Sequence, residues 1–548
     1  MRFLRYVRPL LPGPADYAPM RRTWKGDVLA GVTVGIVALP LALAFGVSSG
    51  VGAEAGIITA IVAGIVAAVF GGSNVQVSGP TGAMVVVLGP IVAAHGVGVI
   101  AIVSALAGVV VLVAGLLKLG RVVGFIPWPV IEGFTLGIAV VIFLQQVPAA
   151  LGGTPHASSS ALVSAVEAFG AIQWPTLGWS LAAVAVTAAI MLLVPRIHKQ
   201  LPASIIAIVV VSLVAAWANL PLARIGELPS RLPAPSIPGF DWAVVSTLVG
   251  PIFAVAALAA IESLLSARVA SSLADTGAYD ADRELVGQGL ASLAAGFFGG
   301  MPATGAIART AVNVRSGGRT RLAAIVHALV LLGVVYLAAS VVSQIPLAAL
   351  SGVLMVTAFR MVSLATVRSV VGSTRADTIV FVITAIITVS FDLIIAVGIG
   401  IAVAAFAALR ALSRAAGVHR EELPLPAQPG DERIALFRLD GALFFGAAER
   451  MLERVNQIRD VSVVIIRMSQ LQVLDATGAN VITEIVRTLE RRGITVLIKG
   501  IQPQHLRLAT HVGVLDALRH QNHLFDSLDA AVEHARSHVR RAQGQRPT

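Results

Sequence analysis

The sequence predicts a polytopic α-helical membrane protein, built from a seven-plus-seven inverted repeat and followed by a smaller α/β domain in the cytoplasm. Three observations predict this architecture. The 548 residues are 56% hydrophobic and 13% charged, and their mean hydropathy of +0.86 is typical of chains that cross a membrane many times. The tripeptide Thr-Gly-Ala occurs twice shortly after a proline, at residues 81–83 and at 304–306. Beyond residue 414 the apolar segments give way to mixed polar and apolar sequence.

About fourteen apolar segments follow one another in the predicted membrane domain, residues 26–414. Several are too short to cross about 30 Å of hydrocarbon on their own, which takes roughly 20 helical residues. The segments lie at residues 28–47, 54–71, 80–94, 99–117, 125–145, 178–194, 203–217, 246–270, 285–300, 305–315, 321–342, 345–360, 376–391 and 392–412.

Charged residues that flank these segments predict the orientation of the chain. Arginines and lysines gather at one set of segment ends, which the positive-inside rule places in the cytoplasm. They are Arg21, Arg22, Lys25, Lys118, Arg121, Arg196, Lys199, Arg315, Arg319, Arg321, Arg410 and Arg414. The connection at 145–180 holds no lysine or arginine and is expected outside, whereas Arg224 and Arg231 are exceptions to the pattern. Residues 1–25 lack the apolar core of a signal peptide, so both termini are expected in the cytoplasm.

Composition and motifs also exclude several classes of function. The chain has no cysteine, which excludes disulfides and cysteine-based metal sites. The net charge of +11 comes largely from the flanking arginines and lysines, so it is explained without nucleic acid. No catalytic dyad or triad, metal-ligand cluster or phosphate-binding loop is recognisable in the sequence. We therefore expect no enzyme activity, no cofactor and no metal site.

The repeated tripeptide marks two homologous halves, at about 26–220 and 246–414. An offset of 223 residues relates the two copies, and it places residue 39, next to Pro40, opposite Glu262. The first segment interrupts its apolar run at Pro40, and the eighth interrupts its own at Glu262. Because seven is an odd number, the second half enters the membrane from the opposite side, as in an inverted repeat.

Each copy of the tripeptide is predicted to begin a half-helix inside the membrane. The proline is tolerated in a first helical turn, the threonine can cap that turn, and the glycine lets backbone or ligand approach. The residues are Pro80, Thr81 and Gly82 in one half and Pro302, Thr304 and Gly305 in the other. Inversion turns the two N-termini toward each other, where free N–H groups and two dipole ends of about half a positive charge attract an anion. The alternative is a chance repeat, against which the prolines, the short segments and the matching offset all argue.

Charged and aromatic residues inside the apolar segments are further candidates. Ionising Glu262 in the membrane is costly unless the carboxylate is paired or protonated, so it is a candidate proton- or cation-binding residue, with Ser266 on the same helix face. The alternative role is a structural hydrogen bond between helices. Arg309 either adds positive charge to the anion site or pairs with Glu262. Phe45 either lines the site or packs in the core.

A soluble α/β domain is predicted at residues 431–548, after a linker at 415–430. Candidate strands lie at 433–439, 441–445, 462–468 and 495–499, and candidate helices at 447–458, 477–491, 502–512 and 527–541.

Five stretches of the chain, taken in order, are characteristic of one family. They are "GDVLAGVTVGIVALPLALAFG", "GGSNVQVSGPTGA", "IESLLSARVA", "ELVGQGLASLAAGFFGGMPATGAIARTAVNVRSGGRT" and "VLDATGANVITEIVRTLERRGITVLIKG". Together they resemble the SulP sulfate-permease family, the bacterial relatives of the mammalian solute-carrier anion exchangers, from about residue 24 to 537. The resemblance implies a core domain and a gate domain with an elevator-type motion, a homodimer in the bacterial inner membrane, and a C-terminal STAS domain.

The resemblance also implies roles for individual residues. Two sets match the halves of the family's anion site: Pro80, Thr81, Gly82 and Ala83 on the third helix, and Gly305, Ala306, Ala308 and Arg309, next to Thr304, on the tenth. Glu262 matches the acidic position associated with coupling, and Ser266 a neighbouring hydroxyl position. Leu41 replaces a glutamine of many members, and Ala476 replaces the phosphorylated serine of related STAS domains, so a phospho-switch at that position is not expected.

These observations predict a secondary active transporter of small anions, of the sulfate, bicarbonate or dicarboxylate class, that works by symport with H⁺. Sodium-coupled bicarbonate members tend to have aspartate at the acidic position and to lack the arginine, so Glu262 and Arg309 favour H⁺ over Na⁺. The alternatives are a passive anion channel, a Na⁺-coupled bicarbonate transporter, and a membrane receptor that senses an anion and signals through the STAS domain.

Overall fold

The computed structural model describes two compact units, residues 1–402 and 403–548, and each has its own hydrophobic core. The described residues are 8–121, 126–153, 161–170, 172, 174–197, 201–228, 230–239, 241–273, 277, 279–390, 393–415, 417–424, 426–443, 460–542 and 544.

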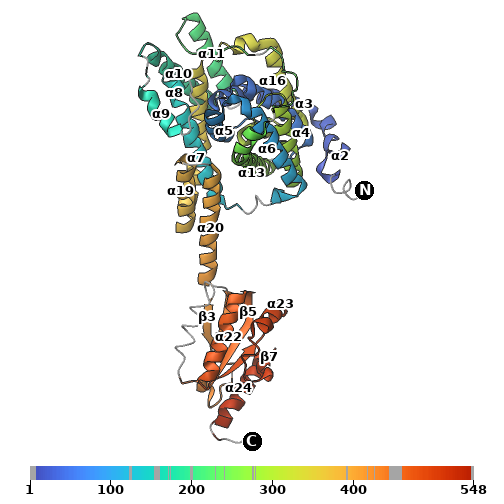
Figure 1. Ribbon diagram of the computed structural model, residues 1–548, viewed down its shortest axis with the longest axis vertical. Helices are drawn as coiled ribbons and strands as arrows, with labels where there is room; N and C mark the ends of the chain where they lie inside the picture. Colours follow the sequence, from blue (N-terminus) through green and yellow to red (C-terminus); the bar gives the residue numbers. More distant parts are fainter. Residues whose placement is uncertain are drawn as a thin grey trace. The chain divides into compact units, whose positions relative to one another are not determined.

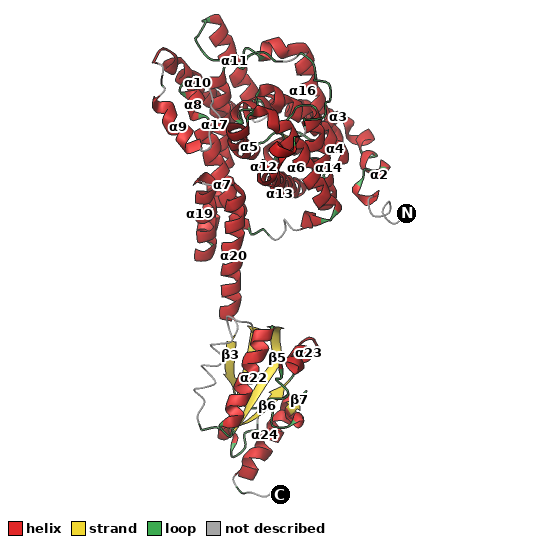
Figure 2. Cartoon of the chain, in the orientation of Figure 1, coloured by secondary structure: helices red, strands yellow, loops and turns green. Residues whose placement is uncertain are grey.

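Every predicted apolar segment contains a helix (Figure 2). In chain order these helices are α3 (Met20–Ser48), α4 (Ala53–Phe70), α5 (Gly82–His95), α6 (Ile100–Leu116), α7 (Trp128–Gln145), α10 (Trp174–Ile197), α11 (Ala203–Trp217), α13 (Val249–Leu273), α14 (Ala281–Phe297), α15 (Ile307–Arg315), α16 (Arg321–Val342), α17 (Leu347–Met361), α19 (Arg375–Ser390) and α20 (Leu393–Ala415). Short helices lie between them: α2 (Pro14–Tyr17), α8 (Val147–Ala150), α9 (Ala161–Gly170), α12 (Trp242–Thr247) and α18 (Leu364–Val371). Eight helices in the described part of the chain are long and apolar enough to cross a membrane, so the chain is a multi-pass membrane protein.

The main contacts between helices of the two repeats occur in matching pairs in the membrane unit. Where one helix from each repeat is in contact, the corresponding contact with the two repeats interchanged is also found. By position in the repeats, α4 corresponds to α14 and α6 corresponds to α16. Helix α6 packs against α14, and α16 packs against α4. In the same way α3 contacts α16 while α13 contacts α6. Two halves related by a two-fold axis produce this exchange, as the predicted inverted repeat requires.

The same contacts divide the helices into two groups (Figure 1). The first four helices of each repeat, α3–α6 and α13–α16, pack mainly on one another. Among the last three of each repeat, α7 packs against α17 and α19, and α10 packs against α11 and α17. Contacts of α5 with α7, and of α3 with α11 and α17, join the two groups.

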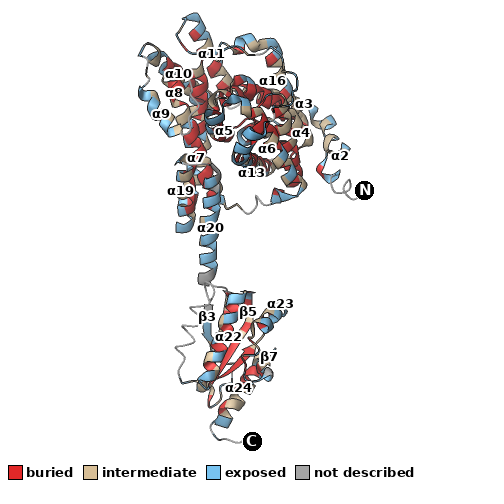
Figure 3. Ribbon diagram, in the orientation of Figure 1, coloured by how far each residue is buried: buried red, intermediate tan, exposed pale blue. Residues whose placement is uncertain are grey.

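Large apolar side chains cover the outside of this unit. Trp217 and Leu337 are each 88% exposed, and Phe359 is 71% exposed. Figure 3 shows exposed residues along outer elements such as α9 and buried residues where the helices meet. So much apolar surface would be unusual in water, and it fits contact with lipid.

Buried charges satisfy helix ends on the side predicted to be cytoplasmic. Asp27 of α3 is fully buried and accepts hydrogen bonds from the N–H groups of Arg319 at 2.7 Å and Thr320 at 3.0 Å, at the start of α16. Its other oxygen accepts from the Thr320 hydroxyl at 2.6 Å. Arg321, one of the flanking charges expected on the cytoplasmic side, is 1% exposed and donates to carbonyl oxygens at the end of α4 at 2.6 and 3.1 Å. A carboxylate at a helix N-terminus and a cation at a C-terminus both match the helix dipole.

Asp27→Asn is expected to lower the melting temperature of the detergent-solubilised protein. The amide keeps the size of the side chain but turns one acceptor into a donor that faces other donors, which costs about 1–3 kcal/mol in a buried site. Asp377→Asn, at the more exposed start of α19, is the matched control and should change the melting temperature little. Equal melting temperatures for wild type and Asp27→Asn would contradict the structural role given to Asp27.

The C-terminal unit is a five-stranded sheet with helices on both faces. The strands are β3 (Gly417–Glu421), β4 (Ile434–Leu443), β5 (Val463–Leu474), β6 (Thr495–Lys499) and β7 (Leu524–Phe525), in the order β3-β4-β5-β6-β7. β3 is antiparallel to β4, and the other pairs are parallel. Alternate residues of β5 point to opposite faces: Val464 and Ile466 belong to the core with α22 (Ala476–Arg491) and α23 (Pro503–Val512), and Ile465 packs with α24 (Leu528–Ala542).

Two expectations for this unit are wrong. The predicted strands 433–439 and 441–445 form one strand, β4, because Gly441 adopts φ +77° at a register shift and bends the strand without ending it. The predicted linker at 415–430 contains β3, so the sheet begins before residue 431. The predicted helix 447–458 lies outside the described residues, and so does Lys199 of the membrane unit.

Candidate functional site

The two Thr-Gly-Ala copies meet at the centre of the membrane unit. Residues just before α5 and α15 pair as two short antiparallel strands, β1 (Ser78–Gly79) and β2 (Thr304–Gly305), with Ser78 opposite Gly305 and Gly79 opposite Thr304. The pairing joins one segment from each repeat, and each segment leads into a half-helix. The predicted convergence of the two segments is therefore observed.

A small hydrogen-bonded cluster lies beside this pairing. The Thr304 hydroxyl donates to the Thr81 hydroxyl oxygen at 3.0 Å, and both hydroxyls lie within hydrogen-bond distance of Oε2 of Glu262, at 2.8 Å from Thr81 and 2.9 Å from Thr304. Thr81 and Thr304 are buried, at 5% and 0% exposure, whereas Glu262 is partly exposed. Glu262 therefore points toward the two half-helices from the middle of α13.

The half-helices begin at slightly different places from those predicted. Thr81 is the N-cap residue of α5, but its side chain makes no capping hydrogen bond and contacts Glu262 instead. The N-cap residue of α15 is Ala306, not Thr304, because Thr304 is held in β2. The expected threonine caps are thus wrong. The first N–H groups of each helix have no partner within that helix.

Arg309 connects the two halves of the site. It is 2% exposed, and its Nη2 atom donates to the carbonyl oxygen of Pro80 at 2.5 Å. Its Nη1 atom is buried and has no hydrogen-bond partner among the described residues. No salt bridge between Arg309 and Glu262 is found in that part of the chain, so the direct pairing that was one of the two expectations is absent there.

The small residues at the helix starts make room for protein side chains. A Cβ atom added to Gly82 would lie 2.2 Å from Cδ1 of Ile142, and one added to Gly305 would lie 1.6 Å from Nε2 of Gln76. The ring of Phe45, which is 7% exposed, lies 3.3 Å from the same Cβ position at Gly82. Ala83 and Ala306 are also buried, whereas Ala308 in the first turn of α15 is exposed.

Three polar residues of this region were not among the residues that the sequence predicted for the site. Ser263 accepts a hydrogen bond from the N–H of Gly305 at 3.0 Å, Gln76 donates to the Ser263 carbonyl oxygen at 3.2 Å, and Thr310 accepts from the N–H of Val77 at 3.0 Å. Ser266, expected to act beside Glu262, lies 3.4 Å from the Thr310 hydroxyl. Its neighbour Ser263 is the residue that supports β2.

Comparison with known proteins places the chain in a family. The model of the sulfate permease family matches residues 24–384, and that of the STAS domain matches residues 426–531. The chain belongs to the sulfate permease family. Among members of known name, the protein called "Putative sulfate transporter YvdB" of Bacillus subtilis is 34% identical over 92% of this chain and 96% of its own length. The bicarbonate transporter BicA of Synechocystis is 30% identical over 89% of this chain and 90% of its own length.

Two solved structures share the fold of this chain. The transmembrane domain of a cyanobacterial BicA covers 69% of this chain and 98% of its own, at 32% identity and a TM-score of 0.61. The structure of SLC26A9 covers 99% of this chain and 95% of its own, at 17% identity and a TM-score of 0.81. This permease is thus an anion transporter of the membrane, and its relatives are named as transporters, not as enzymes.

Proposed function

We propose that the protein is a secondary active transporter that binds a small anion of the sulfate, bicarbonate or dicarboxylate class between the N-termini of α5 and α15. The observation that carries the proposal is the contact between Thr81 and Thr304, which brings two helix starts together. Each start offers free N–H groups and a partial positive charge. Arg309 adds a buried guanidinium whose Nη1 atom has no partner among the described residues. Together these groups supply the chemistry that binds an anion.

Transport by an elevator-type motion agrees with the division of the helices. α5, α13 and α15, which carry the proposed site, all belong to the first group, and α7, α10, α11, α17 and α19 form the second. A rigid-body displacement of the first group against the second would carry the whole site from one side of the membrane to the other. Thr81, Glu262 and Thr304 would then keep their contacts throughout the cycle.

Glu262 is the proposed coupling residue, and H⁺ is the proposed coupling ion. A proton on this carboxyl group would remove a negative charge beside the site where an anion must enter. Na⁺ is the second candidate, because Oε2 of Glu262 and the hydroxyls of Thr81 and Thr304 form a compact set of oxygen atoms, which are the ligands that hard cations prefer.

Uptake into proteoliposomes tests this proposal. Sulfate, bicarbonate, a dicarboxylate, nitrate and chloride would be offered with no gradient, with an inward H⁺ gradient and with an inward Na⁺ gradient. We expect saturable uptake of at least one anion, and about tenfold higher accumulation for each unit of pH gradient if one net proton accompanies each anion. Large anion currents whose size does not change with the H⁺ or the Na⁺ gradient would favour a channel. If no anion is moved, the transport proposal fails.

Deletion of residues 417–548, from the start of β3 onward, separates the transporter from the receptor alternative. A transporter should keep measurable flux without this part of the chain, because the proposed anion site lies in residues 78–309. A receptor that signals through the STAS domain should lose its function completely. Retained flux in the truncated protein supports the transporter.

A further inference from the structure

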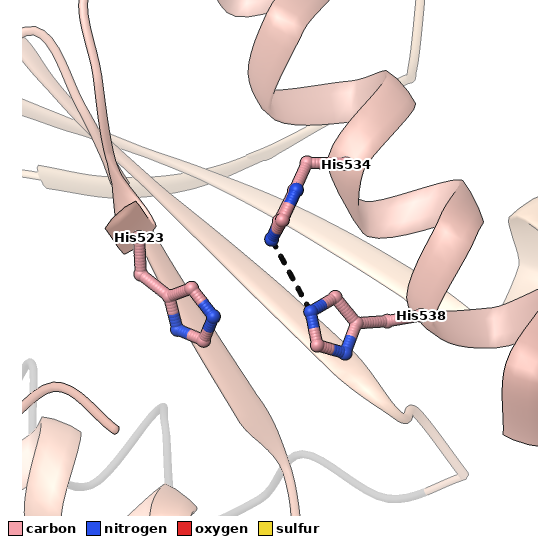
Figure 4. A group of neighbouring side chains, drawn as sticks. All are labelled: His523, His534 and His538. Carbon is pink, nitrogen blue, oxygen red and sulfur yellow. Dashed lines mark hydrogen bonds between the residues drawn. The ribbon is translucent and has the colours of Figure 1, made fainter. Parts of the chain in front are cut away.

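Three histidines meet in the C-terminal unit, in a part of the chain that the proposed transport function does not use (Figure 4). His523 ends the short helix η5 (Gln521–His523), directly before β7, and His534 and His538 lie one turn apart on α24. One ring nitrogen from each histidine lies within 4.8 Å of those of the other two. The Nε2 atoms of His534 and His538 face each other at 3.3 Å.

This spacing is close to that of a metal site. Two imidazole nitrogens that bind one zinc ion at about 2.0–2.1 Å in tetrahedral geometry lie about 3.3 Å apart. The pair on α24 already has this separation, and a modest rotation of the rings would bring the nitrogen of His523 to the same distance. Two elements of different kind, η5 and α24, therefore present a convergent set of three ligands.

His523 has the features of an oriented ligand. Its side chain is 1% exposed, and its Nδ1 atom is buried without a hydrogen-bond partner among the described residues. The same ring hydrogen-bonds to the backbone of Val496 in β6. Histidines that bind metals commonly use one nitrogen for the ion and the other for a backbone carbonyl or carboxylate, which fixes the ring.

The surroundings of the three rings favour neutral imidazole and bear on the kind of ion that could bind. Burial, with smaller contributions from His538, His534 and His520, lowers the pKa of His523 to about 4, and burial also lowers the pKa values of His534 and His538. Neutral imidazole is the form that binds metals. The positive side chains of Arg519 and Arg541 act on the rings as well, which disfavours weakly held cations such as Mg²⁺ and leaves ions with high affinity for imidazole.

We propose that His523, His534 and His538 form a binding site for a divalent transition-metal ion of the zinc class, with solvent in the remaining coordination position. A bound ion would tie α24 to the edge of the sheet where β7 pairs with β6. This differs from the sequence-based expectation of no metal site. A signal was present, because His520, His523, His534 and His538 are separated by two, ten and three residues, a spacing similar to that of paired ligands in structural zinc sites.

Metal binding by the full-length, tag-free protein tests the proposal. The detergent-solubilised protein would be stripped with a chelator, equilibrated with Zn²⁺ or Mg²⁺ and analysed for bound metal, and Co²⁺ would report coordination by its visible absorption. We expect about one Zn²⁺ per chain, no Mg²⁺, and at least about tenfold weaker Zn²⁺ binding in His523→Gln and His538→Gln. His511→Gln, an exposed histidine on α23, is the control and should bind like wild type.

A second measurement guards against variants that fail to fold. Zn²⁺ should raise the melting temperature of the wild type and of His511→Gln but not that of His538→Gln, while the three metal-free proteins melt alike. The proposal is overturned if the wild type binds no Zn²⁺, or if His523→Gln and His538→Gln bind it as tightly as the wild type does.

Discussion

Arg309→Ala is expected to reduce uptake of the transported anion by about 10- to 100-fold. The guanidinium is buried between the two half-helices and is the cation nearest to the proposed site on α15. A hydrogen bond to a charged group contributes about 1.5–3 kcal/mol, and the substitution also leaves the carbonyl oxygen of Pro80 without its donor. Initial rates of uptake at subsaturating anion measure the effect.

Two further variants separate charge from shape at this position. Arg309→Lys keeps the positive charge but loses the planar fork, so we expect partial recovery of uptake. Arg315→Ala removes a cation from the exposed far end of the same helix and should leave uptake unchanged. Uptake by Arg309→Ala equal to that of wild type, with the protein folded, would contradict a role for Arg309 in anion binding.

Glu262→Gln is expected to abolish accumulation driven by a pH gradient while leaving exchange of anion across the membrane. The amide oxygen can still accept the hydrogen bond from the Thr81 hydroxyl, and the Thr304 hydroxyl can still donate to Thr81, so the local fold should persist. The side chain can no longer gain or lose a proton, so an inward H⁺ gradient has no group to act on. The tenfold gain expected for one pH unit and one proton should therefore fall to no gain.

Glu132→Gln provides the matched control for this variant. Glu132 is also a carboxylate on a membrane helix, but it accepts a hydrogen bond from the indole of Trp128 at 3.0 Å on an exposed face of α7. Gradient-driven uptake should survive this change. If Glu262→Gln keeps the full response to the pH gradient, Glu262 is not the proton-coupling residue; if Na⁺ drives uptake in the wild type, the second coupling candidate replaces the first.

Much of the membrane fold could be predicted because its signals are local or periodic. Apolar length locates the helices, and the offset between the two Thr-Gly-Ala copies predicts that they converge. The start of α15 was misplaced because β2, which holds Thr304, forms only when a segment more than 200 residues earlier pairs with it. The sequence contains no local sign of that pairing.

Side-chain partners were harder to predict than positions. Ser263 and Ser266 lie on the same helix, and only the packing of β2 against α13 selects Ser263 as the partner of Gly305. The sequence does not decide whether Arg309 adds charge to the anion site or pairs with Glu262, because that depends on which groups lie near its guanidinium. In the structure the guanidinium donates to the carbonyl oxygen of Pro80, in the other repeat. In the C-terminal unit, Gly441 suggests a break between two strands. In the structure its left-handed backbone conformation lies at a register shift within one strand, β4.

The central claim, that the anion lies between the starts of α5 and α15, is tested most directly by protection of a single cysteine. The chain contains no cysteine, so Ala308→Cys, in the exposed first turn of α15, introduces the only thiol. Ser236→Cys, exposed in the connection between α11 and α12, is the control. Saturating transported anion should slow modification of Ala308→Cys by a negatively charged thiol reagent at least about tenfold and leave Ser236→Cys unaffected. Unchanged modification of an Ala308→Cys protein that still transports the anion would contradict the claim.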